Sequence, residues 1–197
     1  MSHGRVMIVL IALSAFGACH SDDEVESCIV APPPGTAQAA LYVVTGPGTC
    51  ANENSAGATS VTSTPNGGSF AATIRILVKG AKPNTIYFIQ RAPEFPSNET
   101  SADRSCQRAD GLPPWTPPNF AGDLWVTFPK PNTDQGPVKT LTTDAAGDAS
   151  FEFAFHSPSI KIGTKFDVAM RLVDVDVPGV AGVTTELRSG CMTITVL

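Results

Sequence analysis

Histidine, the side chain best suited to acid–base chemistry near neutral pH, is scarce in this sequence. The chain has three histidines, and only His156 lies well inside a region whose pattern predicts folded structure. A Ser/His/Asp triad would therefore need His156, with Ser157 or Ser159 beside it in sequence. No Gly-x-Ser-x-Gly motif is present to expose a nucleophilic serine. We expect His156 to be an ordinary polar residue at the end of a strand.

Acidic residues in the proline-rich segment 92–123 give an alternative enzymatic interpretation. A secreted hydrolase could use Asp103, Asp110 or Asp123 together with His156. No recognisable constellation of acids supports this alternative, so we prefer a non-enzymatic protein.

Metal-binding patterns are absent from the sequence. Asp174-Val175-Asp176, with Gly179 after it, loosely resembles a calcium loop but lacks the ligand spacing of an EF-hand. The cysteines and histidines also lack zinc-site spacing. We therefore predict no metal site and no cofactor.

The same segment holds two aromatic residues, Trp115 and Phe120, among several prolines. Prolines stiffen the backbone and lower the cost of ordering on binding, while the rings offer flat faces to a sugar or a peptide. Trp115 and Phe120 are therefore candidate ligand contacts. The alternative, which we prefer, is that Trp115 folds back and covers the open edge of a sheet.

The amino terminus has the pattern of a secretory signal. Met1–Arg5 carries one positive charge, and Val6–Phe16 is apolar apart from Ser14. This apolar run is about half the length of roughly 20 residues that a membrane-spanning helix needs. Small residues then lead into Cys19, and Ala15-Phe16-Gly17-Ala18-Cys19 resembles the lipobox of bacterial lipoproteins.

That resemblance implies removal of residues 1–18 and lipidation of Cys19. It also implies attachment to the outer membrane, because His20 rather than Asp follows the cysteine. Residues 19–38, which are acidic and contain Pro32-Pro33-Pro34-Gly35, would form a flexible tether, and residues 39–197 one domain. The net charge of −5 at pH 7 argues against nucleic acid as a partner.

An exported chain folds where disulfides form, and four of the five cysteines remain after Cys19 is set aside. Cys28, Cys50, Cys106 and Cys191 could form two disulfides, and the sequence alone leaves three connectivities open. Cys191 alternates with Met192, Ile194 and Val196, so it should point outward toward a loop. Cys106 is then a plausible partner, which would leave Cys28 to pair with Cys50.

The domain must position any site with strands, because its apolar residues alternate. In the stretch Ser69–Arg91, one face of the first run carries Phe70, Ala72, Ile74, Ile76 and Val78, and Thr85–Arg91 resumes the pattern after Gly80–Asn84. We predict a β-hairpin here. A second hairpin is predicted from Val138–Thr142 and Ala149–Phe155 around a turn at Asp144–Gly147.

Further strands are predicted at 39–45, 124–128, 165–174 and 192–196, while 52–68 is mostly loop with a possible short strand at 59–62. Seven or eight short strands with no amphipathic helix indicate an all-β, antiparallel β-sandwich with a long Pro-rich loop.

Lys82–Tyr87 resembles the proline-to-tyrosine corner of fibronectin type III and related immunoglobulin-like domains, which implies an antiparallel immunoglobulin-like β-sandwich. Leu141–Phe151 is similar to a hairpin of secreted bacterial sandwich domains. These resemblances support the architecture and imply no activity. We therefore expect a lipid-anchored cell-envelope protein that acts as a structural or binding module for protein or glycan.

Overall fold

The computed structural model describes residues 35–44, 50–94, 102–109, 125–129, 136–174 and 186–197. All of them belong to the second of two units into which the chain divides, Pro32–Leu197. Several predictions fall outside the described residues: the signal peptide and most of the tether, with Cys19, Cys28, Asp110, Trp115, Phe120, Asp123 and Asp176.

The described chain is all-β, apart from one short 3-10 helix, η1 (Gln107–Ala109). Its ten strands exceed the seven or eight that were predicted, and all of their pairings are antiparallel. The strands are β1 (Thr36–Val44), β2 (Cys50–Thr64), β3 (Ser69–Val78), β4 (Ile86–Glu94), β5 (Val126–Thr127), β6 (Thr140–Thr142), β7 (Ala149–Lys161), β8 (Lys165–Val173), β9 (Glu186–Ser189) and β10 (Met192–Thr195).

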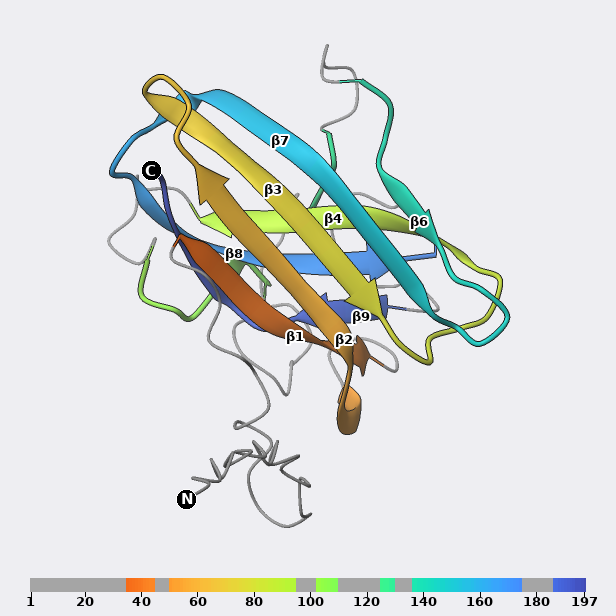
Figure 1. Ribbon diagram of the computed structural model, residues 1–197. Coiled ribbons are helices and arrows are strands. Elements are labelled where there is room, and N and C mark those ends of the chain that lie inside the picture. Colours follow the sequence, from red (N-terminus) through yellow and green to blue (C-terminus); the bar gives the residue numbers. More distant parts are fainter. Residues whose placement is uncertain (1–34, 45–49, 95–101, 110–124, 130–135, 175–185) are drawn as a thin grey trace, which may run out of the picture. The chain divides into compact units, whose positions relative to one another are not determined.

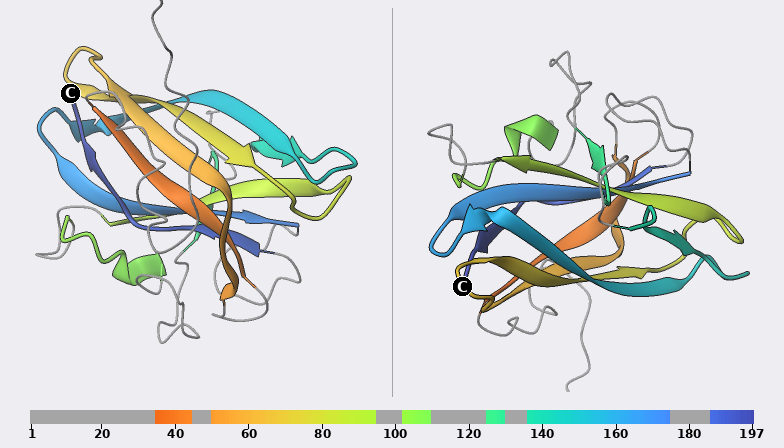
Figure 2. Two further views of the ribbon diagram at one scale, coloured as in Figure 1. Left: turned by 60° about the horizontal axis from the view of Figure 1, so that its bottom comes forward. Right: turned by 90° about the horizontal axis from the view of Figure 1, so that it is seen from above.

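The strands form one hydrogen-bonded sheet in the order β5-β4-β8-β9-β1-β2-β3-β7, while β6 pairs with β4 and β10 with β8. The sheet curls as a half-barrel, so that β1, β2, β3 and β7 form one layer that faces β4 and β8 (Figures 1 and 2). β7 and β5 are the two end strands of this order.

Alternating apolar residues from both layers fill the space between them, as the sequence predicted. Phe70, Ile74 and Ile76 of β3 are at most 3% exposed, and Met170 and Leu172 of β8 are 1% exposed. Phe70 meets Phe166 edge to face with ring centroids 5.5 Å apart, a favourable aromatic geometry. On β7, Phe151, Phe153 and Phe155 pack against this core and are partly buried.

Both predicted hairpins are wrong in their pairing. β3 pairs with β2 and β7, while β4 pairs with β5, β6 and β8, so the chain crosses from one layer to the other at residues 79–85. The turn at Asp144 does form, with Gly147 N donating to Asp144 O at 3.1 Å, but β6 then pairs with β4 and β7 with β3. Alternation determines which face is buried, and two facing layers satisfy it as well as a hairpin does.

The segment 52–68 is another correction, because most of it belongs to the 15-residue strand β2. β2 pairs on one side with β1 and on the other with β3. These two ladders override the weak strand propensity of its Asn, Gly, Ser and Ala residues. β1 begins at Thr36, within the predicted tether, and β9 was not predicted at all.

Candidate functional site

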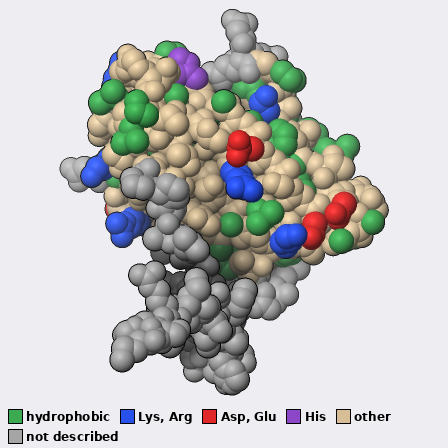
Figure 3. Space-filling model, viewed as in Figure 1, with side chains coloured by type: hydrophobic (Ala, Val, Ile, Leu, Met, Phe, Trp, Pro, Cys, Tyr) green, Lys and Arg blue, Asp and Glu red, His purple; other side chains and the backbone are tan. Residues whose placement is uncertain are grey.

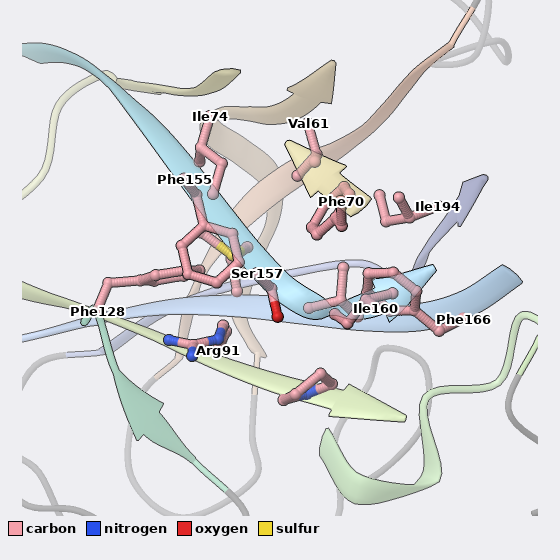
Figure 4. A pocket seen from close by; sticks show the side chains of 13 residues that line it. Val61, Phe70, Ile74, Arg91, Phe128, Phe155, Ser157, Ile160, Phe166 and Ile194 are labelled. Atoms are coloured by element: carbon pink, nitrogen blue, oxygen red, sulfur yellow. The ribbon is translucent and has the colours of Figure 1, made fainter. Parts of the chain in front are cut away.

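A small cavity of about 80 Å³ lies between the layers, where β7 faces β4 and β8 (Figure 4). The described residues of its lining are apolar apart from Arg91 and Ser157, and Arg91 is the one charged residue among them. The aromatic part of the lining is Phe70, Phe128, Phe155 and Phe166. Figure 4 shows the Arg91 side chain beside Phe128, with the Ser157 hydroxyl on the same side of the cavity.

Arg91 lies on β4 between Ile89 and Pro93, in the row of side chains that faces the interior. Its guanidinium carbon lies 4.0 Å from the ring centroid of Phe128 and 5.2 Å from that of Phe155. Nη1 donates a hydrogen bond of 3.2 Å to Thr127 O. A guanidinium has five N–H donors, and this is the one hydrogen bond that Arg91 donates from its side chain to a described residue.

Among the described residues the charge of Arg91 has no acidic counterpart, because none of their ion pairs involves it. Burial lowers the pKa of Arg91 to about 10, so the side chain is still a cation at neutral pH. A partly buried cation that is held only by two rings and one carbonyl is suited to receive an anionic group.

A groove of about 420 Å³ adjoins the cavity and shares Phe128 and Phe155 with it. One wall is Phe128, Pro129 and Lys139, and the other is made of Phe153, Ala154, Phe155, His156 and Pro158 of β7. Neighbouring residues of a strand point to opposite faces, so a groove lined by four successive residues runs along the strand's edge. Within the described part of the chain, that edge of β7 pairs with no strand.

The charge of this region differs from that of the neighbouring surface. The outer face of β2, β3 and β7 carries scattered charges of both signs (Figure 3). Arg75 of β3 and Glu152 of β7, for example, are register partners. The described residues that line the cavity and the groove include Arg91, Lys139 and His156 and no acidic residue.

Of the residues proposed for catalysis, His156, Ser157, Ser159 and Asp103 are described, and Asp103 does not join the others. His156 is an exposed residue inside β7, not at its end as predicted, and its Nε2 lies 3.0 Å from Ser69 Oγ. The Ser157 hydroxyl pairs with Ser159 Oγ at 3.1 Å. Asp103 instead accepts hydrogen bonds from Ser105 and Gln107, and no hydrogen bond joins it to His156 in the described structure.

The predicted disulfide between Cys106 and Cys191 is confirmed, with an S–S distance of 2.05 Å. It connects η1 and its preceding turn to the start of β10, on the outer side of β4 and β8. The predicted pairing of Cys28 with Cys50 concerns side chains outside the described set. Asp174, considered above as part of a calcium-like loop, lies 3.7 Å from Lys82 Nζ.

A buried polar network beside the disulfide was not predicted. Arg171 and Arg188 are both fully buried, and Glu186 lies between them at 3.9 and 2.6 Å. Arg171 also donates to Gln90 Oε1 at 2.7 Å, and both guanidiniums lie over the Trp125 ring. The network attaches Trp125 to β8 and β9, so we interpret it as structural.

Three acidic side chains that sequence spacing did not connect also meet in the structure. Glu94 comes from β4, Asp103 from the turn before η1 and Asp167 from β8, and one carboxylate oxygen of each lies within 4.8 Å of the others. These carboxylates are the one group of three potential metal ligands among the described residues. No local sequence pattern connects these three residues, because long stretches of chain separate them.

Comparison with known proteins gives no functional assignment: no protein-family model, curated protein or solved structure matches this chain. No helix in the described ranges is both long and apolar enough to span a membrane.

Proposed function

We propose that this protein is a non-enzymatic binding module of the bacterial cell envelope, and that its ligand is an extended peptide segment of another protein. The observation that carries this proposal is Arg91, a cation at the junction of the cavity and the groove that forms no ion pair with any described residue. Its position beside the groove suggests an acidic side chain or a terminal carboxylate on the ligand.

The unpaired edge of β7 favours a peptide over other ligands. An extended peptide can add to such an edge as a further strand, with main-chain hydrogen bonds giving affinity and pockets for alternate side chains giving specificity. β7 is 13 residues long, so the edge offers many such hydrogen bonds. The apolar cavity would take one side chain of the ligand, and Arg91 and Lys139 would attract its negative charge.

We also propose that the domain is an immunoglobulin-like β-sandwich. Two facing antiparallel layers support this, as does Tyr87, which is fully buried directly after the turn at Pro83. The turn connections that cross between layers are a further feature of such folds.

The envelope location rests on the amino-terminal sequence. Lipidation of Cys19 would hold the domain at a membrane surface by burying acyl chains, which contributes about 0.8 kcal/mol per methylene. Mass spectrometry of the protein from native membranes should find acyl chains on Cys19, and Cys19→Ser should release the protein into the soluble fraction. An unmodified Cys19 in that material would exclude this anchor.

The peptide proposal can be tested by panning a random twelve-residue peptide library against the purified protein. Enriched peptides should alternate apolar and polar residues and carry an acidic group. Arg91→Met should weaken their binding about tenfold or more, the value of one charge-assisted hydrogen bond. Arg75→Met is the matched control, because Arg75 is exposed on the outer face of β3. Binders that lose no affinity with Arg91→Met, or binding to a glycan array alone, would contradict the proposal.

A further inference from the structure

The acidic group formed by Glu94, Asp103 and Asp167 lies on the opposite face of β4 from the groove. Glu94 and Asp167 are register partners on the paired strands β4 and β8, so two carboxylates stand directly opposite each other. Asp103 adds a third from the turn before η1. Like charges placed directly opposite on paired strands are destabilising, so this arrangement needs a compensating charge.

Glu94 provides an independent sign that the site lacks a partner. The residue is 5% exposed, and its Oε1 accepts a hydrogen bond from the backbone N–H of Arg108. Its Oε2 is buried and has no hydrogen-bond partner. Leaving a buried acceptor unsatisfied costs about 1–3 kcal/mol, and more for a charged group, so native proteins rarely keep one without a ligand.

Burial raises the pKa of the Glu94 carboxyl, the hydrogen bond from Arg108 lowers it, and the charges of Asp167 and Asp103 raise it. The positive charge of Arg108 lowers it by a smaller amount. A bound cation would offset the repulsion among the three carboxylates.

The neighbouring carboxylates are already held in place. Asp167 accepts hydrogen bonds from Arg104 N at 2.5 Å and from Thr193 Oγ1 at 2.6 Å. Asp103 accepts from Ser105 N at 2.9 Å and from Gln107 Nε2 at 2.8 Å. Asp103 Oδ1 also accepts from Ser105 Oγ. The two Asp167 oxygens and Asp103 Oδ2 each accept one of these bonds and keep a second lone pair, so those three atoms can also coordinate a cation.

We propose that Glu94, Asp103 and Asp167 bind a calcium ion. All three offer hard oxygen ligands, and no sulfur or imidazole nitrogen belongs to the group. Calcium accepts six to eight oxygen ligands in irregular geometry, with water or backbone carbonyls completing the shell. Magnesium requires a near-ideal octahedron and gives up its water reluctantly, which suits a group with two buried carboxylates less well.

The ion would join three parts of the structure that are distant in sequence: the end of β4, the turn at 102–106 and the start of β8. The same turn carries the Cys106–Cys191 disulfide. Calcium would therefore stabilise the folded form against heat, because the unfolded chain does not hold the three carboxylates together.

Isothermal titration calorimetry with Ca²⁺, on protein first treated with a chelator, tests this site directly. We expect a dissociation constant of about 10⁻⁵ to 10⁻³ M, in the range of sensors and extracellular modules. A thermal melt should show a Tm that rises with Ca²⁺ concentration. The proposal would be overturned if about 10⁻² M Ca²⁺ produced neither a binding signal in calorimetry nor a rise in Tm. Mg²⁺ that binds as tightly as Ca²⁺ would also overturn it.

Two variants localise the binding. Asp103→Asn should weaken Ca²⁺ binding about tenfold or more, and it should fold normally because Asp103 is exposed. Glu94→Gln should abolish the Ca²⁺-dependent rise in Tm. The control is Asp148→Asn, since Asp148 pairs with Lys79 and lies outside the group. Unchanged affinity in Asp103→Asn would place any binding elsewhere and contradict the assignment.

Discussion

Arg91 occupies an interior position that an apolar side chain would fill at lower cost. Burial depresses its pKa in the folded state to about 10, which means that folding disfavours the charged form. Arginine is charged in both the folded and the unfolded chain below that pH, so the cost is present throughout the physiological range and is relieved only as pH rises above about 10. A binding role explains why such a residue is retained.

Replacing Arg91 by methionine should therefore stabilise the fold. We expect Arg91→Met to raise the free energy of unfolding by about 1 kcal/mol, because an apolar side chain of similar length loses no hydration on burial. This corresponds to a Tm increase of about 2–4 °C in a domain of this size. Thermal unfolding at pH 7 measures it, and a lower Tm would show that the contacts with Phe128, Phe155 and Thr127 outweigh the burial cost.

Thr143 is a second residue whose polar group has a specific role. It is 2% exposed, its hydroxyl donates to Lys82 O at 2.7 Å, and it accepts from Thr85 N at 3.0 Å. Thr143→Val keeps the shape and leaves both backbone groups without this partner. We expect the free energy of unfolding to fall by about 1–3 kcal/mol in urea denaturation.

Thr142→Val is the control for that change, because Thr142 is its exposed neighbour on β6 and valine suits a strand equally well. The control should change stability by less than about 0.5 kcal/mol. Equal effects in the two variants would mean that the Thr143 hydroxyl contributes nothing specific.

Strand faces could be predicted from the sequence, whereas strand partners could not. Phe70, Ile74 and Ile76 alternate with polar residues, so their burial follows from the period of two. Whether β3 pairs with β4 or with β7 depends on packing between layers, and the period of two contains no information about that packing. The short turns at 79–85 and 143–148 gave the same signals that a hairpin turn would give.

The candidate sites were missed for related reasons. Arg91 ended the predicted strand, and a charged residue at a strand end gives no indication that it faces a cavity. Glu94 and Asp167 become neighbours only through the pairing of β4 with β8, which no local pattern encodes. The Cys106–Cys191 disulfide could be predicted from the sequence, because the alternation of β10 indicated that Cys191 points outward.

The two turns that cross between the layers, 79–85 and 143–148, contact each other at Gly147. Gly147 has φ +82°, and its N–H bonds to Asp144 O while its carbonyl accepts from Ala81 N at 3.0 Å. A Cβ at this position would overlap the Ala81 carbonyl oxygen, which is backbone and cannot move aside cheaply. Gly147→Ala should therefore push the turns apart.

Gly163 separates this steric effect from backbone strain. It has φ +80°, nearly the same as Gly147, but a Cβ there would meet nothing within 4 Å. Gly163→Ala should cost about 1 kcal/mol, the usual penalty for a left-handed alanine. Gly147→Ala should cost several times more in chemical denaturation, and similar losses would show that the close approach to Ala81 is unimportant.

At the scale of the whole molecule, the described half-barrel ends at β7 and is reinforced on its opposite side. The reinforced side carries the disulfide, the Arg171–Glu186–Arg188 network and the acidic group, all on the outer face of β4, β8 and β9. A free edge can accept a partner only if the remaining sheet keeps its curvature without one. Stability concentrated away from the groove would allow this.

The disulfide should supply a large part of that stability. It joins residues that are 85 positions apart, so the bond closes a long loop in the unfolded chain. The chain-entropy model gives about 4–5 kcal/mol for a loop of this length, and measured values for native disulfides are typically about 2–4 kcal/mol. We expect the double variant Cys106→Ala/Cys191→Ala to lose about 2–4 kcal/mol in guanidinium unfolding, with peptide binding at the groove retained in the folded fraction. An unchanged midpoint would mean that the turn at 102–106 is held by its carboxylate contacts alone, because Asp167 already binds Arg104 N and Glu94 already binds Arg108 N.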